Sequence, residues 1–337
     1  MNRKGEHSEF MSDTSNVAAT VNPVKTSKRT SAKTGFLWTV RRYWIFYVMM
    51  APAALLLIIN NYIPMAGVLI AFKNVNYTKG ILASPWVGLD NFKYLFSSDV
   101  AWSITRNTIS YNLVFIVLNL VIAVAMAIMF NEMRSKFLSK FHQSTMFLPF
   151  FLSMVCVAYL VYAFLGAEHG FVNTVFLPKL GIQPIDWYTE PKYWTVILPI
   201  VNTWKNLGYY TVIYMAAIIG IDHEYYEAAL IDGANKWQQV KRITIPLIMP
   251  VMITMTLLQV GRIFYADFGL FFQVTKNAGA LFPTTQVIDT YVYQTFLTMG
   301  DIGMSSAAGL YQAVVGFLLV LVTNLFVRKV SKENALF

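Results

Sequence analysis

Charged residues are scarce in this chain of 337 residues, since Asp, Glu, Lys and Arg make up 13% of it, against 56% hydrophobic residues. A water-soluble domain carries about 25% charged residues, so the composition excludes an ordinary soluble domain. Cysteine is scarcer still: Cys156 is the only one and can form no intramolecular disulfide. It lies in an apolar stretch, where a lone cysteine behaves as a small hydrophobic residue and says little about compartment.

Motifs for catalysis and metal binding are also missing. The sequence has no Gly-x4-Gly-Lys-Ser/Thr loop, so we do not expect it to bind ATP in the P-loop manner. Its four histidines are scattered, and neither His-Glu-x-x-His nor Gly-x-Ser-x-Gly occurs. We therefore expect no catalytic site, metal site or bound cofactor, and a membrane-embedded enzyme would lack its polar cluster. An energy source has to come from a partner.

What the sequence has in abundance is long apolar runs. Six runs of roughly 20 or more mostly apolar residues are each long enough to cross a hydrocarbon core as a helix. They are too long and too continuous for barrel strands. The fold class is therefore predicted to be an all-α integral membrane protein with six transmembrane helices. The runs cover residues 44–72, 107–130, 142–165, 193–220, 247–268 and 305–327.

Basic residues gather on alternate connections between these runs. Residues 1–42 carry eight Lys or Arg, whereas residues 166–192 carry two and residues 269–304 carry one. Because basic residues stay cytoplasmic, both termini are predicted to lie in the cytoplasm. The net charge of +9 then reflects topology, and no soluble basic face indicates a nucleic-acid partner.

Composition also divides the chain into parts. Residues 1–40 are poor in large apolar side chains and are expected to form a flexible basic cytoplasmic arm, with a regulatory or lipid-binding role left open. The other predicted parts are a first transmembrane helix at 41–73, an extracytoplasmic loop at 74–106, a core membrane domain at 107–330 with the other five helices, and a cytoplasmic tail at 331–337.

One polar insert, residues 222–246, separates two very hydrophobic runs. Asp222 is a good N-cap for a short helix, and Gly233 permits a sharp bend after it. A second short helix is expected before Pro246, which suits the start of the next run. From these features alone, the insert could be an amphipathic connector that lies at the membrane surface.

The spacing within the insert resembles the EAA loop of binding-protein-dependent ABC importers. That loop reads Glu-Ala-Ala, three residues, Gly, nine residues, Ile-x-Leu-Pro, and the only departure here is Ile245 for Leu. The resemblance implies a cytoplasmic coupling helix that docks into a groove on an ATPase subunit. The coupling residues implied in this way are Glu227, Ala228, Ala229, Asp232, Gly233, Ile243 and Pro246.

Two further segments, Trp-Lys-Asn-Leu-Gly-Tyr at 204–209 and Val-Ile-Asp-Thr-Tyr-Val-Tyr at 287–293, resemble the carbohydrate branch of these permeases, in the type found with polysaccharide and oligosaccharide uptake. The resemblance covers about residues 40–337. It implies the type I ABC importer permease fold in a bacterial cytoplasmic membrane. The implied partners are a second homologous permease in a heterodimer, two ATPase subunits that bind ATP and Mg²⁺, an extracytoplasmic solute-binding protein and an oligosaccharide.

Ionisable residues inside the runs are costly in hydrocarbon and should face protein or water. Lys205, Arg262 and Asp267 are such residues, and they either pair to tie helices together or line the translocation path. On the second interpretation, aromatic rings that stack on sugars complete the path. The predicted path residues are Trp204, Lys205, Tyr209, Arg262, Tyr265, Asp267 and Phe268.

Lys205 and Arg262 are two basic residues inside the runs, against one acidic residue, Asp267. This surplus of positive charge leads to the hypothesis of an acidic oligosaccharide as cargo, because a uronate would accept charge-assisted hydrogen bonds from the basic side chains. A neutral oligosaccharide remains the alternative. The rival mechanism is a secondary carbohydrate transporter driven by an ion gradient. It would be favoured by an inverted repeat and a carboxylate relay at mid-membrane, and the sequence has neither.

Overall fold

The structure is a computed structural model that describes residues 36–97 and 99–330, and it divides the chain after Ile63 into two compact units. The described residues are helical apart from their connections and a single bridge between Lys73 and Trp86. The predicted tail and all but residues 36–40 of the predicted arm lie outside the described residues.

The first unit consists of the helices α1 (Phe36–Arg42) and α2 (Trp44–Leu57) and the π-helix η1 (Ile58–Tyr62). No residue of α2 or η1 is buried. Because these side chains are almost all apolar, such exposure suits a helix surrounded by lipid. Helical structure continues through Phe72, and Trp44–Phe72 is long and apolar enough to span a membrane, as predicted.

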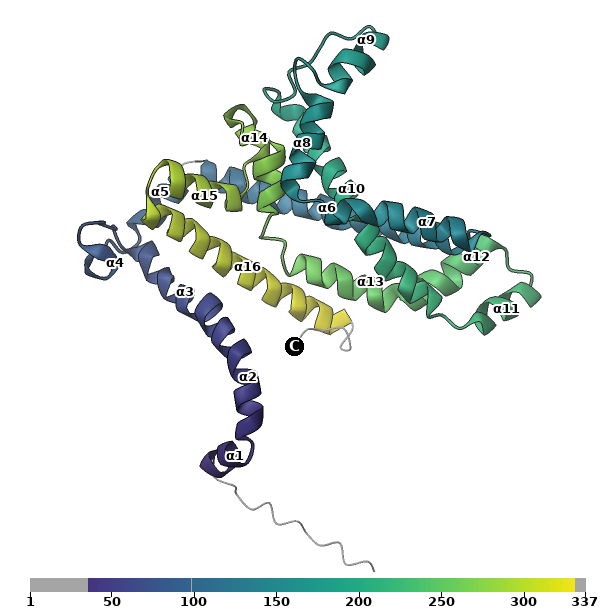
Figure 1. The fold of residues 1–337 in the computed structure, drawn as a ribbon, viewed down its shortest axis with the longest axis horizontal. Coiled ribbons are helices and arrows are strands. Elements are labelled where there is room, and N and C mark those ends of the chain that lie inside the picture. Colours follow the sequence, from purple (N-terminus) through teal and green to yellow (C-terminus); the bar gives the residue numbers. More distant parts are fainter. Residues whose placement is uncertain (1–35, 98, 331–337) are drawn as a thin grey trace, which may run out of the picture. The chain divides into compact units, whose positions relative to one another are not determined.

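The second unit is built around two long helices, α6 (Val100–Asn131) and α10 (Pro191–Ile219), which pack across one another (Figure 1). Their contact buries small side chains of α6, among them Ala123 and Ala127, against Tyr214 and Ile218 of α10. The small residues allow the two helices to approach closely.

Shorter elements complete this unit. Before α10 come α3 (Ile63–Met65), η2 (Ala66–Phe72), α4 (Gly80–Ala83), α5 (Asp90–Phe96), α7 (Lys136–Phe147), η3 (Leu148–Phe151), α8 (Met154–Leu165), η4 (Val172–Phe176) and α9 (Leu177–Lys179). After it come α11 (His223–Ile231), α12 (Lys236–Gln239), η5 (Val240–Thr244), α13 (Ile245–Val260), η6 (Leu270–Val274), η7 (Gly279–Leu281), α14 (Phe282–Thr285), α15 (Ile288–Thr298) and α16 (Ile302–Val330).

Four helices of the described residues are long and apolar enough to span a membrane: Trp44–Phe72, Val100–Asn131, Lys236–Val260 and Ile302–Leu325. A bent pair, Lys136–Phe151 with Met154–Leu165, would make a fifth. Helix α10 has 29 residues, which at about 1.5 Å per residue is long enough, but it is not among the four. Its polar residues, including Asn202 and Asn206, lower its hydropathy. The count of six spans therefore stays a prediction.

The third predicted span, 142–165, is wrong as a straight helix, because the chain bends by 102° between Phe151 and Met154. The free carbonyl groups at the bend accept hydrogen bonds from Lys205 Nζ, at 2.7 Å for Leu152 and 3.0 Å for Phe150. Non-helical backbone within a membrane requires such internal partners. The bend is therefore stabilised by a side chain from α10.

Candidate functional site

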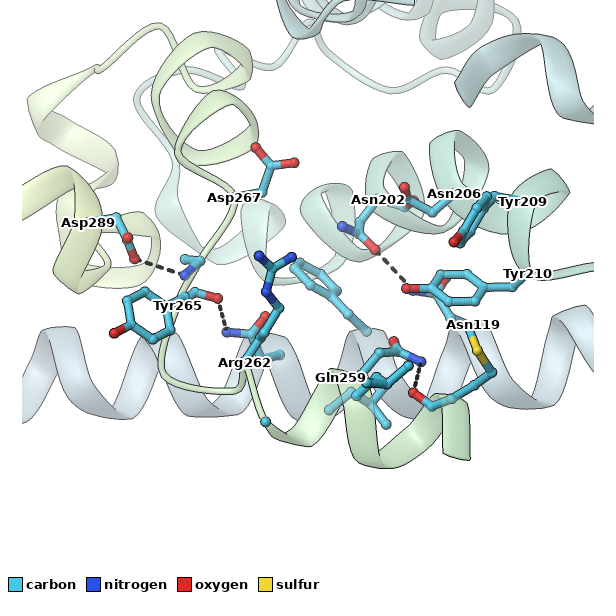
Figure 2. A pocket seen from close by; sticks show the side chains of 17 residues that line it. Asn119, Asn202, Asn206, Tyr209, Tyr210, Gln259, Arg262, Tyr265, Asp267 and Asp289 are labelled. Atoms are coloured by element: carbon cyan, nitrogen blue, oxygen red, sulfur yellow. Dashed lines mark hydrogen bonds between the residues drawn. The ribbon is translucent and has the colours of Figure 1, made fainter. Parts of the chain in front are cut away.

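A polar cavity of about 910 Å³ lies between α6, α10, α13 and the non-helical segment 261–267 (Figure 2). Its lining is rich in amides and tyrosines, with one guanidinium and two carboxylates. The lining residues are Asn112, Phe115, Ile116, Asn119, Asn202, Asn206, Tyr209, Tyr210, Met255, Leu258, Gln259, Gly261, Arg262, Tyr265, Ala266, Asp267 and Asp289.

The wall between α6 and α10 presents buried amides to the cavity. Asn119 Nδ2 donates a hydrogen bond of 3.4 Å to Asn202 Oδ1, which links the two helices (Figure 2). Asn119 Oδ1 is buried and accepts no hydrogen bond from the described residues. Since buried polar atoms are generally hydrogen-bonded, this oxygen is an exception in the wall of the cavity.

The opposite wall is the break that follows α13. The fifth predicted span, 247–268, is wrong at its C-terminal end, because α13 stops at Val260 and residues 261–267 are not helical. Side chains from other helices satisfy the backbone of this break, as membrane-buried backbone requires. Asn112 of α6 donates to the carbonyls of Ile263 (2.9 Å) and Tyr265 (3.2 Å).

Two further side chains, from α15 and α16, hold the same break. Asp289 Oδ2 accepts hydrogen bonds from the Ala266 N–H (2.8 Å) and from Gln312 Nε2 (3.0 Å). Gln312 Nε2 also donates to the Phe264 carbonyl at 2.8 Å. Burial raises the pKa of Asp289 above its ordinary value. The break is therefore fixed between three helices, and it presents Arg262 and Tyr265 to the cavity.

The three charged groups of the cavity differ in how they are engaged. Asp267 Oδ1 accepts a hydrogen bond from the Leu270 N–H (3.1 Å), and Asp289 is bound as above. Arg262 has no ion pair with an acidic group of the described residues, and its side chain extends into the middle of the cavity (Figure 2). The guanidinium is thus the charged group that is left available to a ligand.

Of the predicted path residues, Tyr209, Arg262, Tyr265 and Asp267 line this cavity. Phe268 lines an adjoining cavity of about 340 Å³, where its ring stacks on Phe272 at 4.9 Å. Trp204 and Lys205 line neither of these cavities.

Lys205 is buried and points toward the bend after η3 rather than toward the cavity. No ion pair joins Lys205 or Arg262 to Asp267 among the described residues. The lining of this cavity holds one base and two acids, because Lys205 is absent from it and Asp289 is a second acid beside Asp267.

The amides of the cavity were missed in the sequence, although their spacing contained a signal. Asn112 and Asn119 are seven residues apart, and Asn202 and Asn206 are four apart, so each pair lies on one face of its helix. Such polar faces on apolar helices predict that the two faces meet. Asp289 and Gln312 had no comparable signal, because their partners are backbone groups of the distant break.

The polar insert 222–246 folds into helices as the sequence predicts. Asp222 caps α11 by accepting a hydrogen bond from the Glu224 N–H (3.1 Å). Gly233 follows with φ of 79°, a value that a side chain with a Cβ rarely adopts. Of the predicted coupling residues, Glu227, Ala228 and Ala229 lie on α11, Asp232 and Gly233 follow it, Ile243 lies on η5, and Pro246 is the second residue of α13.

Helix α11 and its surroundings expose apolar side chains. No residue of α11 is buried. Ile231 is 87% exposed, Leu230 65% and Trp237 71%. An apolar patch beside polar residues marks a site for another protein or for a membrane surface.

More than half of the chain matches a known family. The family model described as "Binding-protein-dependent transport system inner membrane component" matches residues 119–332. The match includes α10, the insert 222–246, α13 and α16.

Similar proteins and structures extend the likeness to most of the chain. The polygalacturonan/rhamnogalacturonan transport system permease protein YteP of Bacillus subtilis (strain 168) is 31% identical over 292 residues, which is 86% of this chain and 89% of that protein. A chain in the crystal structure of a bacterial ABC transporter involved in the import of the acidic polysaccharide alginate superposes with a TM-score of 0.80 and 32% identity. That match covers 88% of this chain and 99% of that chain. A chain in the crystal structure of a bacterial alginate ABC transporter in complex with alginate pentasaccharide-bound periplasmic protein superposes with a TM-score of 0.79 and 31% identity. That match covers 88% of this chain and 98% of that chain.

Proposed function

The chain belongs to the family of binding-protein-dependent transport system inner membrane components, and from that membership we propose that it carries oligosaccharides inward across a bacterial cytoplasmic membrane. It is a multi-pass permease subunit of an ABC importer and not itself an enzyme. The ion-gradient alternative is not favoured by this membership. The family match is the observation that carries the proposal, and the polar cavity between α6, α10 and the break after α13 is the site that we propose for the cargo.

The chemistry of the cavity suits a saccharide. Amide groups both donate and accept hydrogen bonds, as sugar hydroxyls do, and five amide side chains line the cavity. Tyr209 and Tyr265 are partly exposed along the lining. A ligand that combines many hydroxyls with flat apolar faces uses both kinds of group.

The cargo that we propose bears uronate groups. Arg262 is the charged group of the cavity that has no acidic partner among the described residues, and an Arg holds a carboxylate in bidentate fashion. The two acids of the cavity already accept hydrogen bonds from the protein. The relatives named for polygalacturonan/rhamnogalacturonan and for alginate support the same cargo class. A neutral oligosaccharide is the second candidate, favoured by the excess of carboxylates over guanidinium in the lining.

The exposed apolar residues of α11 and Trp237 support a coupling role for the insert. In the proposed assembly, this surface docks into one of two ATPase subunits, which bind ATP and Mg²⁺. A second, homologous permease would complete the translocation path as a heterodimer, and an extracytoplasmic binding protein would deliver the cargo. Both termini and the insert would then lie in the cytoplasm.

The cargo is tested with the complete transporter and its binding protein in proteoliposomes. We expect Arg262→Gln to lower uptake of a uronate trisaccharide by about 10-fold or more, since a hydrogen bond to a charged group contributes roughly 1.5–3 kcal/mol. Uptake of the matching neutral trisaccharide should change little. Lys276→Gln, outside the cavity, is the control. Equal losses for both sugars would remove the uronate proposal, and ATP-independent uptake would contradict the importer mechanism.

A further inference from the structure

A second cavity, of about 650 Å³, lies where α6 ends, α7 begins, α10 ends and α11 begins. It shares no lining residue with the polar cavity that Arg262 lines. Its floor is apolar and comes from the helix ends of α6 and α10. The apolar lining residues are Phe130, Met133, Met215, Ile218, Ile219 and Ile221.

Four basic side chains line the same cavity: Arg134, Lys136, Lys140 and Lys236. Its single acidic lining residue, Glu132, forms an ion pair of 2.9 Å with Lys236. The other three have no acidic partner among the described residues. Positive-inside topology accounts for basic residues on this side of a membrane, but not for three unneutralised cations around one apolar hollow.

Hydrogen bonds give this hollow a defined frame. Ser139 Oγ of α7 donates to the Phe130 carbonyl of α6 at 3.0 Å, and Gln143 Nε2 donates to Ser139 Oγ at 2.8 Å. The Glu132–Lys236 pair ties the end of α6 to α12. These contacts link α6 to α7 and to α12 around the cavity.

We propose that this cavity binds the headgroup of an anionic phospholipid. The unneutralised cations suit a phosphate group through charge-assisted hydrogen bonds, and the apolar floor suits the glycerol and the first acyl carbons. Basic hollows between transmembrane helices at the cytoplasmic edge bind such headgroups. A soluble phosphate would use the cations but gain nothing from the floor.

Headgroup binding here also bears on coupling. His223 and Tyr226 of α11 line the cavity, and the Tyr226 hydroxyl hydrogen-bonds Thr244 Oγ1 of η5 at 2.9 Å. A bound headgroup would therefore contact the first turn of α11.

The test uses the complete transporter in vesicles of phosphatidylcholine alone or mixed with phosphatidylglycerol, followed by native mass spectrometry of retained lipid. We expect the wild type to retain phosphatidylglycerol, and the double variant Lys136→Gln/Lys140→Gln to retain about 10-fold less or lower. The matched control is Lys241→Gln/Arg242→Gln, two exposed basic residues outside the cavity. Arg134→Gln alone should give an intermediate loss.

Several results would overturn the proposal. Equal retention by the wild type and the double variant, or equal loss in the control, would show that the lipid does not use this cavity. Displacement of the lipid by inorganic phosphate or glycerol phosphate would instead assign a soluble anion. Retention only when the ATPase subunits are removed would assign the cations to the ATPase interface. None of these readouts depends on which sugar is transported.

Discussion

Lys205 illustrates how one side chain can have two opposite interpretations. A lysine inside a transmembrane helix suggests a substrate site, but here its three strongest contacts are backbone carbonyls of the bend, those of Pro149, Phe150 and Leu152. Gly208, three residues later, packs directly against the backbone of α7, since a Cβ there would lie 2.3 Å from the Met146 carbonyl oxygen. These two residues of the 204–209 segment support the bent pair α7–α8 rather than a ligand.

Replacing Lys205 by Met keeps an unbranched side chain, one atom shorter, but removes its donors. The carbonyls at the bend then lose their partner, and we expect the free energy of unfolding to fall by about 3 kcal/mol. The measurement is the thermal midpoint of the purified complex, with Lys241→Met, at an exposed position, as control. The ratio of uronate to neutral uptake should not change. An unaltered thermal midpoint together with an altered ratio of uronate to neutral uptake would instead support the interpretation that Lys205 lines the translocation path.

At the scale of elements, the interruptions of helices matter more than the helices. The bend at 152–153 and the break at 261–267 each expose backbone groups that only another helix can satisfy. The break carries the cavity's guanidinium, and Asn112, Asp289 and Gln312 hold it. A rigid frame around an irregular segment fixes its side chains more closely than a free loop would.

The insert contains an interruption of another kind, at Gly233. Its φ of 79° costs a residue with a Cβ about 1–2 kcal/mol and a β-branched residue more, although no atom lies within 4 Å of the position of that Cβ. We expect Gly233→Val to lower uptake by at least about 10-fold without changing the amount of protein in the membrane. Asn tolerates this backbone region, so Gly233→Asn is the matched control, and its uptake should fall less than that of Gly233→Val. Full uptake by Gly233→Val would argue against a coupling role for this turn.

For the whole molecule, orientation in the membrane is the property on which every proposed partner depends. Alternation of basic connections predicts that α7 begins in the cytoplasm and that α9 lies outside. In the second unit, both segments expose side chains that can be replaced for labelling, Leu138 and Leu180 among them.

Cysteine labelling with a membrane-impermeant reagent tests this orientation in a Cys156→Ser background, because Cys156 is exposed. We expect Leu138→Cys and Trp237→Cys to react only after the cytoplasmic side is opened. Leu180→Cys and Ala280→Cys should react in intact cells. Labelling of Leu138→Cys from outside would contradict this orientation, and it would place α11 on the opposite side of the membrane from a cytoplasmic ATPase.

The family, the membrane class and the polar insert follow from the sequence, because hydropathy, capping residues and loop spacing are local properties. Asp222 and Gly233 take the roles that their chemistry predicts within a few residues of chain. The first span also begins and ends where its apolar run does, at Trp44 and Phe72.

The site required the tertiary structure, for a physical reason. Arg262 and Asp289 reach one cavity only because the helix breaks after Val260 and because α15 returns to the break. Neither event has a strong local signal: an apolar run continues past Val260, and the donors that stabilise the break come from Asn112 and Gln312, far away in the chain. The hydrogen-bond partners of these backbone groups depend on how the helices pack. Only the packing therefore decided which charged side chains line the cavity that we propose for the cargo.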